Sequence, residues 1–524
     1  MKKVVVRGIS MPIKHTEADV FEKASAVLKK QGIAPSYMTV YKKSLDARRK
    51  SDIHFEYTVA AEAERVSENL DGGLISILED TKPLDLAELK GRNNTAKKTV
   101  VVGSGPCGLF AAYVLASSGT EVTVIERGGD VDKRQKLIDK FWQCGILDKN
   151  TNVQFGEGGA GTFSDGKLNT RIGDPLQRFV LETFTECGAP REILYQAKPH
   201  IGTDILKICV KNLRKKIEEL GGKVLFDTKM TDIKIKNGQI VSVLTDSAEI
   251  ECDRLILAIG HSSRDTYEML YKKGIVMEQK PFAAGVRIEH RREFINRVQY
   301  GNSPDVELLP TADYRLAYNG EDRSCYSFCM CPGGVVVNAS SEDEHLVVNG
   351  MSNHSRMAEN SNSALVVSVR PSDFDGSSPL AGVEFQRKYE AMAYKVAGGK
   401  GPVQLAKDFV TDQISPKFDG VKPSFTGETA FVDLRECLPK FITDTLKDGL
   451  FDFDRKMKGF LGEGAVLTGV EMRTSAPLRI VRNEKFESIS CGGLFPAGEG
   501  AGYAGGIMSA AIDGIKIAKQ ILQN

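Results

Sequence analysis

A glycine-rich segment after the first strongly apolar strand carries the clearest chemical signal in this sequence. Residues 99–128 read TVVVGSGPCGLFAAYVLASSGTEVTVIERG. Gly103, Gly105 and Gly108 give the pattern G-x-G-x-x-G, which follows a valine run and precedes apolar residues at helical spacing. Such a turn lets the backbone approach a pyrophosphate, and the helix behind it offers free N–H groups to the phosphates. The segment therefore predicts a dinucleotide-binding βαβ unit.

An acidic residue at the end of the next predicted strand supports this interpretation. The run from Val122 to Ile125 ends in Glu126, which stands 18 positions after Gly108. A carboxylate at this place accepts hydrogen bonds from a ribose diol in dinucleotide-binding folds. The alternative is an ordinary tight turn of an α/β protein, and the strand, helix and acidic residue together favour nucleotide binding.

The C-terminal segment distinguishes FAD from NAD. Residues 491–524 read CGGLFPAGEGAGYAGGIMSAAIDGIKIAKQILQN, which predicts a strand at 494–497, a turn around Glu499, and a helix after Gly505 and Gly506. This resembles the C-terminal flavin motif of the two-dinucleotide-domain flavoprotein superfamily. The resemblance implies that the acidic residue binds the ribityl chain, although the superfamily usually has Asp where this chain has Glu499. It also implies that the helix N-terminus points at the flavin ring and favours negative charge there.

A third segment agrees with the superfamily pattern. Residues 222–260 alternate in the manner of strands and end in a short strand before Gly260. The resemblance places this last strand in the central sheet and the backbone near Met230 beside adenine. Between residues 260 and 465, no second G-x-G-x-x-G follows a strand. The sequence therefore predicts bound FAD without a separate NAD(P)H domain of the glutathione-reductase type.

A second glycine-rich stretch offers polar groups to the cofactor. Residues 156–170 read GEGGAGTFSDGKLNT, and five glycines in 156–166 disfavour a regular helix or strand. We expect residues 158–168 to lie along the flavin, with Lys167 near the flavin ring or on an anionic substrate. The alternative is a surface loop.

Three of the ten cysteines stand close together in residues 323–334, RSCYSFCMCPGG. Cys329 and Cys331 could form a redox-active pair with the flavin. However, C-x-C differs from the C-x-x-C of disulfide reductases, and residues one apart on a strand point to opposite faces. A metal site needs more ligands than are visible here, so no metal is predicted. Buried structural thiols are the main alternative.

Residues 469–480, GVEMRTSAPLRI, come just before the predicted C-terminal flavin strand. Chain order therefore places Glu471 and Arg473 near the cofactor, where an arginine could hold a carboxylate or phosphate. The alternative is an ion pair at a domain hinge. Arg479 and His261 are further candidates with weaker signals.

The whole chain must supply elements that position these groups, and its 524 residues suggest three domains. Residues 1–95 are expected to hold a small ferredoxin-like α+β domain and a polar linker at 81–98. The FAD-binding domain is predicted at 96–275 plus 465–524, with a central parallel sheet. Residues 276–464 are predicted to form an inserted α+β cap over the flavin.

Composition narrows the range of partners and compartments. The net charge of +1 provides no global attraction to nucleic acid or an anionic membrane. The first residues predict a strand instead of a signal peptide, and no run of about 18 apolar residues occurs. We therefore expect a cytoplasmic protein with reduced thiols and no membrane span. The basic run at 42–50 is expected to be a solvated hairpin loop, or else an anion-binding or docking patch.

With these segments in view, the chain resembles a family of bacterial FAD-dependent dehydrogenases. The resemblance covers essentially the whole chain and rests on SLDARRK, GSGPCGLFAA, FGEGGAGTFSDGKL, SFCMCPGG, NGMS, EMRTSAPLRI and PAGEGAGYAGGI. It implies bound FAD and oxidoreductase activity, and it supplies no substrate. NADH or NADPH as a diffusing reductant, or a protein partner, both remain open as electron donor. An FAD-containing protein that modifies or binds RNA is the alternative function, and the near-zero net charge argues against it.

The candidate catalytic residues are Lys167, Arg473, Cys329 and Cys331. The residues expected to contact the cofactor are Gly103, Gly105, Pro106, Cys107, Gly108, Glu126, Arg127, Arg134, Gly159, Ala160, Gly161, Thr162, Asp165, Gly166, Lys167, Leu168, Met230, Ala258, Gly260, Gly498, Glu499, Gly505, Gly506 and Ile507.

Overall fold

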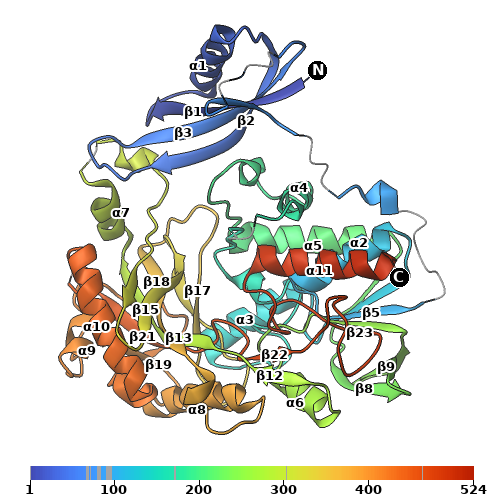
Figure 1. The fold of residues 1–524 in the computed structure, drawn as a ribbon. Coiled ribbons are helices and arrows are strands. Elements are labelled where there is room, and N and C mark those ends of the chain that lie inside the picture. Colours follow the sequence, from blue (N-terminus) through green and yellow to red (C-terminus); the bar gives the residue numbers. More distant parts are fainter. Residues whose placement is uncertain are drawn as a thin grey trace.

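The computed structural model of this chain places a small N-terminal domain above a larger body (Figure 1). It describes residues 2–66, 70, 72–79, 84–89, 97–169, 173–302, 304–462 and 464–523. The larger body contains a parallel sheet with its helices and a separate mixed sheet. The predicted α/β architecture with a Rossmann-like sheet is thereby confirmed.

The N-terminal domain is an antiparallel sheet with one helix against it. Its helix α1 (Glu17–Lys30) begins at Thr16, whose side chain accepts a hydrogen bond from the Asp19 backbone in a capping box. Its strands pair in the order β2-β3-β1-β4, which fits the ferredoxin-like arrangement expected from the sequence. The strands are β1 (Lys2–Pro12), β2 (Pro35–Asp46), β3 (His54–Ala63) and β4 (Ile75–Ile77).

The basic run was expected to be a hairpin loop, and its first half instead belongs to β2. Lys43 lies over the ring of Phe55, with its amino group 4.6 Å from the ring centre. Its backbone N–H also donates to the carbonyl of Tyr195 in the flavin domain, at 2.7 Å. Arg48 pairs with Asp46. The strand extends further than predicted because pairing with β3 satisfies its backbone at 42–46.

A five-stranded parallel sheet forms the centre of the flavin domain, in the order β23-β11-β5-β6-β7. These strands are β5 (Thr99–Val102), β6 (Val122–Ile125), β7 (Lys223–Leu225), β11 (Arg254–Leu257) and β23 (Leu494–Pro496). The helices of this domain are α2 (Pro106–Ser117), α3 (Val131–Cys144), α4 (Leu176–Glu186), α5 (Thr203–Glu219), α6 (Arg264–Lys272) and α11 (Ile507–Gln523). An antiparallel sheet of β8 (Met230–Lys236), β9 (Gln239–Thr245) and β10 (Glu249–Glu251) joins β7 to β11.

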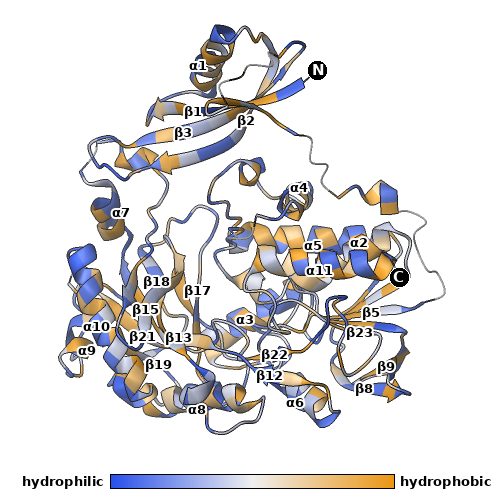
Figure 2. Cartoon of the chain, viewed as in Figure 1, coloured by the Kyte–Doolittle hydropathy of each residue, from blue (hydrophilic) through white to orange (hydrophobic). Residues whose placement is uncertain are grey.

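Helix α2 lies between its neighbours and is apolar on every face. Its residues 107–117 are all buried, and it packs against both α11 and α5. By contrast, α5 and α11 show hydrophobic and hydrophilic residues along their visible faces (Figure 2). None of the helices in the described part of the chain is long and apolar enough to span a membrane.

A seven-stranded mixed sheet forms the cap domain, in the order β14-β15-β18-β13-β21-β19-β20. Its strands are β13 (Phe282–Arg291), β14 (Ala317–Asn319), β15 (Ser324–Cys331), β18 (Asn360–Val369), β19 (Gly401–Leu405), β20 (Thr429–Phe431) and β21 (Val466–Glu471). The hairpin β16 (Val335–Asn338) and β17 (Val348–Met351) accompanies the sheet, with helices α7 (Arg292–Tyr300), α8 (Ala381–Val396), α9 (Ala406–Val410) and α10 (Lys440–Lys456). A ribbon of β12 (Met277–Gln279) and β22 (Leu478–Ile480) connects the domains.

The domain boundaries differ from the prediction at one of the two cap junctions. Strand β21 pairs with β13 and β19, so residues 466–471 belong to the cap and not to the flavin domain. The apolar pattern of this strand could not reveal which sheet it joins. The boundary at 95/96 and most of the predicted linker at 81–98 lie outside the described residues, apart from 84–89 and 97–98.

Candidate functional site

The glycine-rich turn joins β5 to α2 in a backbone conformation that side chains would obstruct. Gly103 has φ +103°, and a Cβ there would lie 2.3 Å from the carbonyl oxygen of Ala258. A Cβ at Gly108 would lie 1.9 Å from the Gly103 carbonyl oxygen. Gly105 caps α2 without a side-chain hydrogen bond, so no cap side chain among the described residues occupies the first N–H groups of the helix. This leaves a helix N-terminus suited to phosphate.

The carboxylate of Glu126 connects this turn to the second glycine-rich stretch. One of its oxygens accepts from the backbone N–H and the hydroxyl of Ser104, each at 2.9 Å. The other accepts from the backbone N–H groups of Gly128 and Gly156, each at 3.0 Å. Glu126 also lines a cavity that both glycine-rich segments border. Its carboxylate therefore organises the glycine-rich turn, and the predicted ribose contact stays a prediction.

Arg134 lies inside the second glycine-rich stretch instead of facing the cavity. Its guanidinium is fully buried and donates to the backbone carbonyl groups of residues 152, 153, 156, 157 and 159. Burial lowers the pKa of Arg134 to about 9, while Glu126 and Glu157 nearby favour its charged form. Arg134 was predicted to contact the cofactor. Its guanidinium instead supports the glycine-rich stretch, because five backbone carbonyl groups surround it.

Both glycine-rich segments meet helix α11 around a cavity of about 390 Å³. A Cβ at Gly159 would lie 3.0 Å from Cα of Gly105, and one at Gly161 would lie 3.0 Å from the side chain of Ile507. A Cβ at Gly505 or Gly506 would meet no atom within 4 Å, because these residues border open space. The glycines thus keep a flat cradle free of side chains.

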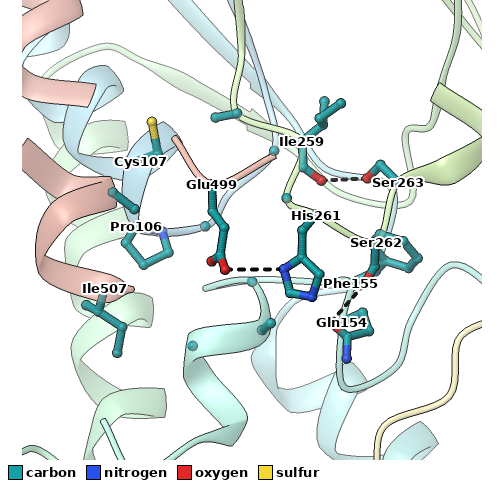
Figure 3. Close-up of a pocket in the computed structure, with 18 of the residues that line it drawn as sticks. Pro106, Cys107, Gln154, Phe155, Ile259, His261, Ser262, Ser263, Glu499 and Ile507 are labelled. Carbon is teal, nitrogen blue, oxygen red and sulfur yellow. Dashed lines mark hydrogen bonds and ion pairs between the residues drawn. The ribbon is translucent and has the colours of Figure 1, made fainter. Parts of the chain in front are cut away.

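Two polar side chains from different segments face one another in this cavity (Figure 3). Nδ1 of His261 lies 3.6 Å from a carboxylate oxygen of Glu499. Burial raises the pKa of Glu499 to about 7 and, together with Arg473, lowers that of His261 to about 3. Nε2 of His261 is buried and has no hydrogen-bond partner among the residues that the structure describes. Because buried polar atoms are rarely left unpaired, this nitrogen fits a ligand atom in the cavity.

The cap domain and the Lys167 segment complete the cavity on another side. Lys167, Cys329, Glu471 and Arg473 all line it, together with Asn349. The amino group of Lys167 donates to the carbonyl of Met330 and lies 3.8 Å from the Asp165 carboxylate. Segment 166–168 is held by backbone hydrogen bonds to 199–201, next to the residues that pair with β2 of the N-terminal domain.

Arg473 takes part in a buried ion network between the two domains. Its guanidinium donates to both carboxylate oxygens of Glu390 in α8, at 2.9 and 2.6 Å, and to Ser262 and Ser341. Arg264 donates to the same carboxylate at 2.6 Å. These two arginines lower the pKa of Glu390 to about 2 despite its burial. The hinge ion pair considered from the sequence is therefore present, although Arg473 still borders the cavity.

The sequence-predicted residues divide into those that line the cavity and those that support it. Nineteen of the twenty-four expected cofactor residues line it. The five others stand behind the wall, where they allow close packing or form the core: Gly108, Arg134, Thr162, Leu168 and Gly498. Cys331 is also behind the wall. Arg479 pairs with Glu278 outside the cavity.

Several residues that line the cavity were not predicted as site residues from the sequence. Gln154 and Phe155 line it just before the glycine-rich stretch, and Phe328 and Asn349 line it from the cap. Arg287 lies behind Glu471 with no exposed surface. An arginine within the otherwise apolar run FAAGVRI indicates a buried charge that needs polar partners.

The cap and the glycine-rich region both match known families. Residues 281–474 match the family model described as "FAD-dependent protein, C-terminal domain-like". A protein of Clostridium beijerinckii (strain ATCC 51743 / NCIMB 8052), named as an uncharacterized protein, is 51% identical over 499 residues. That similarity covers 93% of this chain and 92% of the relative. This chain belongs to the same family as that protein.

A second model, pyridine nucleotide-disulphide oxidoreductase, matches residues 24–158. The glycine-rich turn and the β5-α2-β6 unit fall within this match, whereas its first part covers the N-terminal domain. The protein is therefore a FAD-dependent oxidoreductase, and FAD is its cofactor. The sequence predictions of FAD and of an oxidoreductase are confirmed.

Solved structures show weaker similarity. CtdE in complex with FAD is 13% identical, with 82% of this chain and 87% of that chain covered and a TM-score of 0.33. Glycine oxidase from Bacillus cereus ATCC 14579 is 12% identical, with coverage of 81% and 94% and a TM-score of 0.34. Tetracycline destructase Tet(55) is 9% identical, with coverage of 83% and 82% and a TM-score of 0.36.

Proposed function

We propose that this oxidoreductase transfers a hydride or electrons between FAD and a small substrate bound beneath the cap domain. One observation carries the proposal. A single cavity is lined by the glycine-rich cradle on the flavin-domain side and by polar cap residues, including Cys329, Asn349 and Glu471. A cofactor in the cradle would leave its reactive ring facing these groups.

The chain's residues suit the proposed binding of FAD in stated positions. The N-terminus of α2 would receive the pyrophosphate, and residues 126–127 and 230 would border the adenosine end. Glu499 and the N-terminus of α11 would face the ribityl chain and ring. When bound, FAD supplies the two-electron chemistry that protein side chains lack.

The cap side offers groups that can orient a substrate and handle a proton. Lys167 presents its amino group at the wall, and the neighbouring Asp165 carboxylate already receives two hydrogen bonds from Arg356. Burial raises the pKa of Glu471 to about 7 although Arg287 opposes the shift. A carboxyl with this pKa can take up or release a proton at neutral pH. Arg473 acts as a positioning residue because Glu390 holds its guanidinium.

The electron donor is part of the same proposal. The described residues contain one parallel sheet with the dinucleotide-binding turn, in the order β23-β11-β5-β6-β7. NADH or NADPH could diffuse into the cavity and reduce FAD there, and the substrate would bind in the same cavity after the oxidised nucleotide leaves. A protein donor is the other outcome of the test below.

The first experiment is the visible spectrum of the purified protein, followed by anaerobic addition of NADH and then NADPH. Bleaching of a flavin spectrum by either nucleotide would support the proposed reductive half-reaction. A yellow protein that neither nucleotide bleaches would contradict a diffusing pyridine nucleotide and favour a protein donor. A colourless protein that cannot be reconstituted with FAD would overturn the proposal.

Lys167 can be tested against a matched lysine. We expect Lys167→Met to lower kcat/KM at least tenfold at unchanged FAD content, because a charge at the cavity wall is lost. Lys198 stands on the neighbouring segment, is 67% exposed and pairs with Asp313 at 2.8 Å. Lys198→Met should retain normal turnover. Equal turnover of both variants and the wild type would remove Lys167 from the substrate site.

A further inference from the structure

The two cysteines of the C-x-C segment do not alternate across strand β15. The pairing of β15 with β18 shifts between Phe328 and Cys331, which marks a β-bulge. Cys329 stands in this bulge with φ +43°, a left-handed conformation that costs a non-glycine residue free energy. The bulge overturns the expectation of opposite faces, because an irregular strand no longer alternates. The Cys331 sulfur instead lies 3.3 Å from the Cys329 carbonyl oxygen.

The surroundings of this pair favour a thiolate beside a thiol. Cys329 lines the cavity, whereas Cys331 is fully buried just behind it. Arg287 lies between the pair and Glu471, and it donates to the Cys329 carbonyl at 3.4 Å. Hydrogen bonding from Cys331, with Arg287 and Lys167 nearby, lowers the pKa of Cys329 to about 6. The same contact and burial raise the pKa of Cys331.

These features differ from those of Cys325, the third cysteine of β15. Cys325 has no exposed surface, lies outside the cavity, and has a pKa that burial alone raises. Nothing in a purely structural role requires a left-handed cysteine at the cavity wall. Strained residues of this kind cluster at functional sites.

We infer that Cys329 and Cys331 form a second redox centre, a dithiol that closes to a disulfide as it exchanges electrons with FAD. Formation of the S–S bond releases two electrons and one proton from a thiolate and a thiol. FAD accepts that same pair of electrons with one proton, so the exchange balances without a further reagent. The inference rests on the proposed placement of FAD in the cavity.

The test counts electrons in the FAD-loaded protein. The holoenzyme is oxidised with ferricyanide, desalted and titrated anaerobically with dithionite. We expect the wild type to take up four electrons per FAD before excess reductant appears. Cys331→Ser should take up two, and the same-strand control Cys325→Ala should take up four. The absorbance of the flavin measures the FAD content independently of the thiols. Loss of FAD can therefore be distinguished from loss of the dithiol centre.

Peptide mapping of the wild-type protein gives a readout without any variant. After ferricyanide treatment and alkylation under denaturing conditions, a peptide containing residues 329–331 should carry an internal disulfide. The dithionite-treated sample should carry two alkyl groups there instead. A peptide that is fully alkylated in both samples, or a wild type that takes up only two electrons per FAD, would overturn the inference even if Cys331→Ser failed to fold.

Discussion

Replacing Glu126 by glutamine tests whether this carboxylate organises the cofactor turn. The carboxylate accepts four hydrogen bonds, two of them from Ser104. A glutamine side chain can accept only at its oxygen, and its NH₂ group must then face other donors. The best orientation places that NH₂ against Ser104, whose hydroxyl can turn to accept while its backbone N–H cannot. The substitution therefore leaves one buried N–H group without a partner.

The loss in the free energy of unfolding follows from the hydrogen bonds that Glu126→Gln removes or weakens. An unsatisfied buried donor costs about 1–3 kcal/mol, and the remaining bonds lose their charge assistance. We expect a total of about 2 kcal/mol, which corresponds to a fall of about 4–8 °C in the melting temperature of a domain this size. Ser104→Ala removes only the hydroxyl bond and should lower the melting temperature by a smaller amount.

The assay is thermal unfolding of the FAD-free protein, followed by circular dichroism, with FAD affinity measured separately. The FAD-free state isolates the protein's own hydrogen bonds from any contact to ribose. A melting temperature of Glu126→Gln within about 1 °C of the wild type would refute the reasoning. Unchanged stability with weaker FAD binding would instead favour the ribose contact predicted from the sequence.

Three further predictions follow from the same geometry. Because the pKa of Glu499 is raised to about 7, the folded state binds more protons than the unfolded state between pH 4.5 and about 7. The contribution of Glu499 to stability therefore falls as pH rises through this window. Between pH 5 and pH 7.5, the melting temperature of FAD-free Glu499→Gln should fall less than that of the FAD-free wild type. Gly108→Ala should abolish FAD binding because its Cβ would lie 1.9 Å from a backbone oxygen. By contrast, a Cβ at Gly173 would meet no atom of the described residues within 4 Å, so Gly173→Ala should bind FAD normally in a fluorescence titration. Arg134→Met removes a donor from five carbonyl groups, two of which still accept from the backbone N–H groups of Gly159 and Thr162. The purified protein should contain less than a tenth of the wild-type flavin per mole by absorbance. Normal flavin content would show that the stretch folds without this cation.

Short-range patterns were sufficient to locate the glycine-rich segments that line the cavity. The spacing of Gly103, Gly105 and Gly108 depends on backbone sterics within one turn, and the structure gives each the close approach that excludes a side chain or borders the cavity. The strand that ends before Glu126 and the helix after Gly506 were likewise visible as local periodicity. Local rules of this kind act between neighbours in the chain, so one sequence is enough to apply them.

Partners far apart in the chain decided the roles of individual side chains. Arg473 meets Glu390 across 83 positions, and Arg287 meets Glu471 across 184. Neither pairing has a local signature, because the sequence offers 69 acidic residues and nothing near either arginine in the chain selects one of them. The residue patterns thus determined a FAD-dependent oxidoreductase and the glycine-rich segments that line its cavity. The bulge at Cys329 and the buried ion pairs arose from sheet pairing and domain packing, which depend on contacts that the chain makes only once folded.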